Sequence, residues 1–226
     1  MDVVTVATET HGRVLVETPS AARPGDSTRW LVAFHGYGQS ASEMLTDVMK
    51  IPGIGRWHVA APQALSRFYT RGHERVVASW MTREDREQVI LDNLAYIDRV
   101  VNDVARSADA LVFLGFSQGA PMAYRAAMLG ERPASGIVAL AGDVPPELKI
   151  PGSAAPHLSA APGRSWPRVL IGAGREDPRY SAALCDEDER ALRALEVDLE
   201  VNRFSGGHEW TDQFREAAAE WLAKID

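Results

Sequence analysis

The chain has 226 residues, of which 46% are hydrophobic and 24% are charged. This length and composition predict one soluble globular domain, residues 1–226, and exclude a disordered chain, a coiled coil and a collagen-like fibre. The net charge of −7 disfavours binding to a nucleic-acid backbone. The single cysteine, Cys185, cannot form a disulfide within the chain, and we expect it to be a small buried residue. Nothing in the sequence predicts a signal peptide or a membrane span, so we expect a cytoplasmic protein.

Short apolar runs alternate with helical patterns along most of the chain. Near the N-terminus, two valine-containing runs predict a hairpin that spans residues 3–16 and turns near Gly12. The predicted elements that follow are strands at 30–34 and 57–61, a helix at 84–106, a strand at 111–116, a helix at 118–129, strands at 136–141 and 169–172, a helix at 182–195, a strand at 197–204 and a helix at 211–225. The last strand alternates apolar and polar residues, which indicates a place near a sheet edge.

The helix at 84–106 has the clearest period, and Thr82 is its expected N-cap. Its apolar residues recur every three or four positions: Ile90, Leu94, Ile97, Val101 and Val104. Residues 143–167, which are rich in proline, glycine and alanine, predict a long surface loop. Strands that alternate with helices predict an α/β fold with a mostly parallel sheet, helices on both faces and no large cap.

The strongest chemical motif is GFSQG, residues 115–119, which fits the G-x-S-x-G pattern of a nucleophile elbow. It follows an apolar run and precedes a helical pattern, so Ser117 lies at a strand-to-helix turn. The alternative is an ordinary glycine-rich turn in which the serine caps the helix. A serine nucleophile needs a base and an acid, and on such sheets these follow it along the chain.

His208, in SGGHEW, follows the last predicted strand and is the expected base. His157 lies in the irregular loop and is a poor candidate. Two carboxylates, Glu176 and Asp177, follow the preceding strand. We favour Asp177 as the acid, because an Asp-Pro pair begins a turn that directs the side chain towards His208. The order Ser117, Asp177, His208 is then that of an acyl-transfer site.

An acyl-transfer site also needs two backbone N–H groups that hold the developing oxyanion. One is expected from Gln118, the residue after the nucleophile. The other is expected from the loop HGYGQ, residues 35–39, after an early strand, and we assign it to Tyr37. The glycines of this loop allow its backbone to approach a carbonyl oxygen.

With these four motifs, HGYGQ, GFSQG, G-x-x-D-P and GGHEW, the chain resembles the phospholipase/carboxylesterase family of the α/β-hydrolase superfamily, which includes bacterial carboxylesterases and acyl-protein thioesterases. The resemblance implies a triad of Ser117, Asp177 and His208, an oxyanion hole of the Tyr37 and Gln118 amides, and hydrolysis of carboxylic esters or thioesters without a cofactor. The chain differs where the family commonly has HGLGD, and where Arg67, Arg71 and Arg75 replace the more apolar wall we would expect.

The segment 62–82 lies on the expected active-site edge and supplies candidates for an acyl pocket: Phe68, Tyr69, Trp80 and Met81. Alternatively, these side chains pack the loop onto the domain. The three arginines of this segment either hold an anionic substrate group or are solvated surface charges. The six histidines show no spacing typical of metal ligands, so we expect no metal site.

The sequence therefore predicts a serine hydrolase that cleaves carboxylic esters with small to medium acyl chains through an acyl-enzyme on Ser117. Its substrate would be a small-molecule ester or thioester, and a homodimer is possible. The alternatives are a lysophospholipase or an acyl-protein thioesterase, and a non-catalytic binding module of the same fold. A preference for long acyl chains would favour the first pair. Failure to react with a serine-directed probe would favour the binding module.

Overall fold

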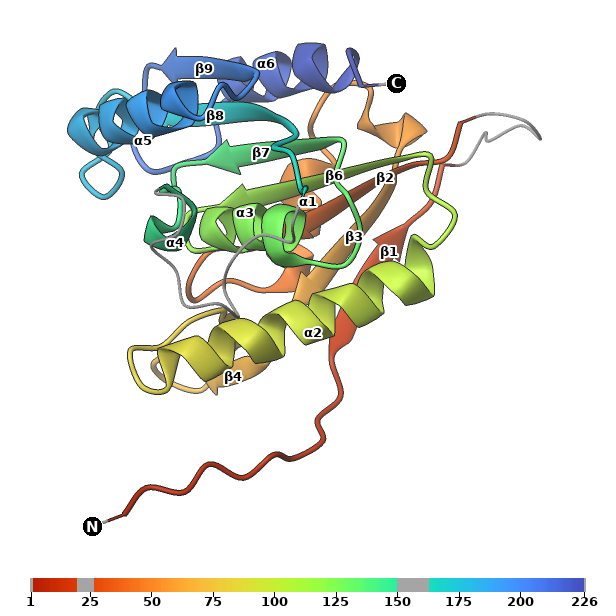
Figure 1. Cartoon of the computed structure of the whole chain (residues 1–226), viewed down its shortest axis with the longest axis vertical. Coiled ribbons are helices and arrows are strands. Elements are labelled where there is room, and N and C mark those ends of the chain that lie inside the picture. Colours follow the sequence, from red (N-terminus) through yellow and green to blue (C-terminus); the bar gives the residue numbers. More distant parts are fainter. Residues whose placement is uncertain (1, 20–26, 150–162, 226) are drawn as a thin grey trace.

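The computed structural model describes residues 2–19, 27–149 and 163–225, which form one α/β domain (Figure 1). The described residues contain a seven-stranded sheet in the order β1-β3-β2-β6-β7-β8-β9. All neighbouring strands are parallel except β1 and β3. Its strands are β1 (Arg13–Glu17), β2 (Arg29–Phe34), β3 (His58–Gln63), β6 (Ala110–Phe116), β7 (Gly136–Leu140), β8 (Arg168–Gly174) and β9 (Leu199–Phe204).

Helices cover both faces of this sheet, as predicted (Figure 1). The side chains of the central strands point alternately to two hydrophobic clusters because successive strand residues face opposite sides. One cluster contains α2 (Arg86–Val104), α3 (Gly119–Leu129) and α5 (Ala182–Ala194). The other contains α1 (Ala41–Val48), η1 (Ile54–Arg56) and α6 (Asp212–Leu222). Cys185 is buried in the first cluster.

The central strands are apolar throughout because both of their faces are covered. Every residue of β6 is buried. β9 is the last strand of the sheet order, as its alternating sequence predicts. The carboxyl ends of the parallel strands meet at one edge, where open α/β sheets hold their ligands. Among the described helices, none is both long enough and apolar enough to cross a lipid bilayer.

The N-terminal prediction was wrong. Residues 2–12 contain no strand, and the first part of this segment extends away from the domain (Figure 1). β1 pairs antiparallel with β3, where Arg13 lies opposite Gln63. The Tyr96 hydroxyl fixes the start of β1 by donating to the Arg13 carbonyl at 3.0 Å. The pairing of β1 with β3 replaces the predicted local hairpin, because it partly buries Val14 and Leu15 against the domain.

The predicted cap of α2 was also wrong. The Thr82 hydroxyl donates to the carbonyl of Glu84 at 2.9 Å, so it does not cap the helix. The helix begins at Arg86 after Asp85, whose backbone is left-handed with a φ of 48°. The sequence reading also missed several short elements, which are α1, η1, the hairpin of β4 (Ser66–Tyr69) and β5 (Val76–Ser79), and α4 (Pro146–Lys149). α4 lies inside the predicted loop at 143–167, of which residues 150–162 are outside the described residues.

Candidate active site

The turn between β6 and α3 holds Ser117 in a strained backbone conformation with a φ of 54°. Such a left-handed conformation is uncommon for a residue with a side chain, and it occurs often at functional sites. Two glycines permit it. A Cβ on Gly115 would overlap the carbonyl of Gly119, and a Cβ on Gly119 would overlap the carbonyl of Phe34. The tight turn therefore presents the Ser117 hydroxyl at the carboxyl end of β6.

Three side chains that are far apart in the sequence form one hydrogen-bonded chain at this turn. His208 Nδ1 lies 2.8 Å from Asp177 Oδ2, and His208 Nε2 lies 2.7 Å from Ser117 Oγ. Because a carboxylate only accepts hydrogen bonds, Nδ1 carries the proton and donates it to Asp177. Nε2 is then free to accept from the Ser117 hydroxyl. This is the tautomer that a general base for serine requires.

The Asp177 carboxylate is held from its other side by its own loop. Oδ1 accepts the backbone N–H groups of Arg179 at 2.7 Å and Tyr180 at 3.0 Å. The Tyr180 hydroxyl in turn donates to Asp188 of α5 at 2.9 Å. Glu176, the competing carboxylate, has an exposed side chain. The structure therefore brings Asp177 to His208 and leaves Glu176 at the surface. His157 lies outside the described residues.

One expected oxyanion donor, Gln118, belongs to the turn that carries Ser117, and the other, Tyr37, belongs to the loop after β2, the strand that pairs with β6. Within the described residues, neither the Tyr37 nor the Gln118 backbone N–H donates a hydrogen bond to another protein group. The neighbouring N–H groups of the first loop are used. Gly36 donates to Gln39 Oε1 at 2.7 Å, and Gly38 donates to the carbonyl of Ala78 at 3.0 Å. Two unused donors beside a serine hydroxyl are what an oxyanion hole needs.

The Gln118 side chain has a role that the sequence reading missed. Its Oε1 accepts the N–H of Trp80 at 2.8 Å. Its Nε2 donates to the Ser79 hydroxyl at 3.0 Å and to the Met81 carbonyl at 3.1 Å. The amide therefore fastens the segment after β5 to the residue that follows Ser117.

His35 is a second residue whose role was missed. It is fully buried; its Nδ1–H donates to the Gly36 carbonyl at 2.8 Å, and its Nε2 accepts the Ala64 N–H at 3.1 Å. Its own carbonyl accepts from Trp80 Nε1 at 3.0 Å. Burial lowers the pKa of His35 below its usual value, which keeps the imidazole neutral in this arrangement. The sequence feature that could have pointed to this role was the position of His35 directly before Gly36 in the HGYGQ loop.

Comparison with known proteins identifies the family of this chain. The sequence model of the Phospholipase/Carboxylesterase family matches residues 19–226. The chain belongs to this family. Family members include enzymes that hydrolyse esters and thioesters, so the chain is a hydrolase-family protein with an α/β-hydrolase fold. A search of curated proteins found no match.

Solved structures of three proteins show the same fold at low sequence identity. Acyl-protein thioesterase 2 from Zea mays is 19% identical, with a TM-score of 0.73 over 94% of this chain and 98% of that one. Esterase PE8 is 22% identical, with a TM-score of 0.70 over 95% and 98%. The Bacillus cereus carboxylesterase is 19% identical, with a TM-score of 0.71 over 95% of each chain.

In this member of the phospholipase/carboxylesterase family, a cavity of about 210 Å³ lies beside Gln118. Trp80 and Met81 line it, as two of the four predicted pocket residues. Phe68 and Tyr69 do not line it; they lie on β4 with exposed fractions of 36% and 61%. The Phe68 ring lies 5.6 Å from that of Tyr37. β4 forms a separate two-stranded sheet with β5, which carries the aromatic pair Phe68 and Tyr69 away from the cavity.

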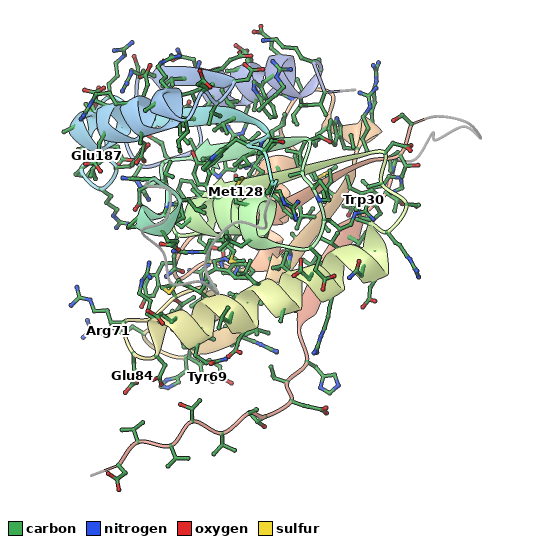
Figure 2. All side chains as sticks on the ribbon, viewed as in Figure 1. Trp30, Tyr69, Arg71, Glu84, Met128 and Glu187 are labelled. Carbon is green, nitrogen blue, oxygen red and sulfur yellow. The ribbon has the colours of Figure 1, made fainter. Side chains whose placement is uncertain are left out.

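The three arginines of the 62–82 segment do not line this cavity either. Arg67 donates to the His11 carbonyl at 2.6 Å, and Arg75 pairs with Glu43 at 2.9 Å. Arg71 is exposed at the periphery of the molecule (Figure 2). Two other arginines line the cavity: Arg86, which begins α2, and Arg125 of α3. The sequence feature that could have pointed to Arg125 was an arginine inside the apolar helical stretch GAPMAYRAAML.

Proposed function

We propose that the protein is a serine carboxylesterase in which Ser117 is the nucleophile, His208 the general base and Asp177 the acid. The observation that carries this proposal is the hydrogen-bonded chain from Asp177 through His208 to Ser117, with distances of 2.8 and 2.7 Å. Membership of a hydrolase family supports the same reaction class. The proposed substrates are small-molecule esters, because the cavity of about 210 Å³ is below the range of roughly 300–1,000 Å³ typical of larger ligands.

The reaction follows from the positions of these groups. His208 Nε2 takes the hydroxyl proton while Ser117 Oγ attacks the ester carbonyl carbon. The carbonyl oxygen becomes an oxyanion, which the N–H groups of Tyr37 and Gln118 stabilise; one such donor contributes about 3 kcal/mol in known hydrolases. Asp177 stabilises the imidazolium without taking its proton.

The tetrahedral intermediate then collapses. The His208 imidazolium gives its proton to the leaving alkoxide, and the alcohol departs from the acyl-enzyme. A water molecule enters the vacated place, His208 removes its proton, and hydroxide attacks the acyl carbonyl. Collapse of the second intermediate releases the carboxylic acid and returns the proton to Ser117. A thioester follows the same course with a thiol as the leaving group.

Labelling by a fluorophosphonate probe tests the proposal, because the probe reacts only with an activated serine. We expect wild-type protein to be labelled and Ser117→Ala to remain unlabelled, with ester hydrolysis reduced by at least about 10⁴-fold. Ser66→Ala is the matched control, because Ser66 is an exposed serine on β4. Labelling that survives Ser117→Ala, or a wild-type protein that does not react, contradicts the proposal. The second result favours a binding module.

A series of esters with increasing acyl length tests the substrate size. We expect kcat/KM to be highest at short to medium chains, since the cavity is small. A maximum beyond about ten carbons would instead assign the protein to the lysophospholipases or acyl-protein thioesterases.

A further inference from the structure

The cavity beside Gln118 has an apolar part and a charged part. Trp80, Met81 and Met122 supply its apolar wall. Arg86, Arg125 and Asp143 supply charged groups. The side chain of an α-helical residue points towards the N-terminus of its helix, so the Arg125 side chain extends along α3 towards the Ser117 turn. Gly119 and Arg125 are six residues apart, which corresponds to about 9 Å along the helix.

Arg125 is a buried cation with free donors. Its exposed fraction is 3%, and its Nε donates to Glu147 Oε1 at 2.7 Å. Its two terminal nitrogens donate no hydrogen bond to any residue that the structure describes. Arg86 lies nearby, with Nη2 at 3.9 Å from Glu147 Oε2. Glu147 thus offsets one positive charge of the arginine pair, and the donors of Arg125 remain available at the cavity.

The terminal nitrogens of Arg125 are not among the fully buried side-chain atoms that lack a partner, so solvent in the cavity reaches them and a bound anion can take the place of that water. A guanidinium presents its N–H groups as a planar fork that matches the two oxygens of a carboxylate. An alkyl chain alone would leave these donors without an acceptor. Asp143 also lines the cavity, and its negative charge disfavours an anion there. Removing that charge therefore tests the charge balance independently of the arginines.

We propose that this cavity takes an acyl group that ends in a carboxylate, so that the substrate is a monoester of a short dicarboxylic acid. The inference rests on the proposed function for the position of the ester group at Ser117. The acyl chain lies along Trp80, Met81 and Met122, and its terminal carboxylate accepts from Arg125 and Arg86. Hydrolysis releases the alcohol and a free dicarboxylate.

Length-matched esters test the proposal on the full chain. The substrates are the monoethyl esters of succinic, glutaric and adipic acid, each paired with the neutral ethyl ester of the same acyl length: butyrate, valerate and hexanoate. Acid release is followed in a pH-stat. We expect wild-type kcat/KM to be at least tenfold higher for one or more of the anionic esters than for its neutral partner. A neutral ester that is hydrolysed as well as its anionic partner at every length overturns the proposal.

Variants of the charged groups give the second measurement, which is the ratio of kcat/KM for the anionic over the neutral ester. Arg86→Gln is expected to lower this ratio at least tenfold, and Asp143→Asn to raise it. Arg125→Met combined with Glu147→Leu removes the buried ion pair together, so that no buried charge is left unpaired, and is expected to lower the ratio because Arg86 alone remains as a cation at the cavity. Arg71→Gln, at a remote exposed arginine, is the control with an unchanged ratio. Equal ratios in Arg86→Gln and wild-type protein contradict the proposal.

Binding to the Ser117→Ala variant separates this inference from the proposed function. Calorimetry with monoethyl adipate and ethyl hexanoate requires no catalysis, and only the first of these esters carries a carboxylate. We expect monoethyl adipate to bind at least tenfold more tightly, and the difference to be lost when Arg86→Gln is added. Equal affinities overturn the carboxylate site. If wild-type protein hydrolyses none of the esters but the variant prefers monoethyl adipate, the proposed function fails while the carboxylate site stands.

Discussion

The Gln118 side-chain oxygen accepts the backbone N–H of Trp80 at 2.8 Å, so one residue links the Ser117 turn to the wall of the cavity. The same residue supplies a backbone N–H beside Ser117. The position of the proposed oxyanion donor and the position of the proposed substrate wall are therefore coupled through a single side chain.

Gln118→Ala tests this coupling, because it keeps the backbone N–H and removes the side-chain amide. We expect kcat/KM for a short ester to fall by about 10–100-fold, and the free energy of unfolding to fall by about 1–3 kcal/mol, because buried hydrogen-bonding groups lose their partner. Steady-state kinetics and urea denaturation measure the two effects. Gln88→Ala, at an exposed glutamine of α2, should change neither. Wild-type kinetics in Gln118→Ala would show that the Trp80 segment holds its place without this amide.

The neighbouring carboxylates Asp177 and Glu176 provide a matched pair of variants. Asp177→Asn keeps the shape of the side chain but disfavours the His208 tautomer that accepts from Ser117, so we expect kcat to fall by about 10⁴-fold. Glu176→Gln should alter kcat by less than about threefold, because the Glu176 side chain is exposed. Hydrolysis of a short ester by both purified variants decides between them. A larger loss in Glu176→Gln would move the acid role to that residue.

Tyr180→Phe removes the hydroxyl that donates to the buried Asp188 carboxylate at 2.9 Å. Asp188 keeps the Val144 N–H and the Lys149 ammonium as partners, so the fold should remain intact. We expect a loss of about 1–2 kcal/mol in the free energy of unfolding. A smaller loss in kcat should accompany it, since Tyr180 also holds Asp177 through its backbone. Thermal unfolding and kinetics on the same preparation measure both; unchanged stability would contradict the role of the hydroxyl.

The buried His35 predicts a pH dependence of stability. Burial lowers the pKa of its imidazole below the usual 6.5, so the unfolded chain binds the proton more readily than the folded chain. Its contribution is therefore fully present above about pH 6.5 and is lost as the pH falls towards the lowered pKa. Urea denaturation at pH 7.5 and pH 5 should show a smaller acid loss for His35→Gln than for wild type, although the variant is less stable at pH 7.5. Equal acid losses in the two proteins would contradict this role.

The buried strands and the order of the candidate site residues were predictable because they depend on local patterns. β6 is apolar throughout because it is covered on both faces, and the glycines around Ser117 are required by a turn that no Cβ can enter. The same patterns placed Asp177 and His208 after later strands of one parallel sheet. The order of strands along the chain was therefore enough to bring distant residues to one edge.

The predictions that failed, and the residues that were missed, depended on contacts that sequence patterns do not reveal. Threonine is a residue type that commonly caps helices, yet the Thr82 hydroxyl donates to the carbonyl of Glu84 instead. Phe68 and Tyr69 are aromatic residues of the kind that line pockets, yet the pairing of β4 with β5 places them outside the cavity. Arg125 lines the cavity with its Nε paired to Glu147 of α4, a contact that the sequence pattern does not show. In each case the sequence pattern does not show which partner a side chain or strand takes in the fold.

β1 has a consequence for the association of this protein with other chains. It covers the edge of β3, and it carries Arg13 and Glu17 at its two ends, whereas the β3 sequence HVAAPQ has no acidic residue, lysine or arginine. Charged ends on a short outer strand discourage edge-to-edge pairing between molecules. A variant that begins at residue 19, where the family match begins, lacks β1. It would expose the β3 backbone as a template for a strand from a second copy. β1 thus occupies the edge of β3 that a strand from a second copy would otherwise use.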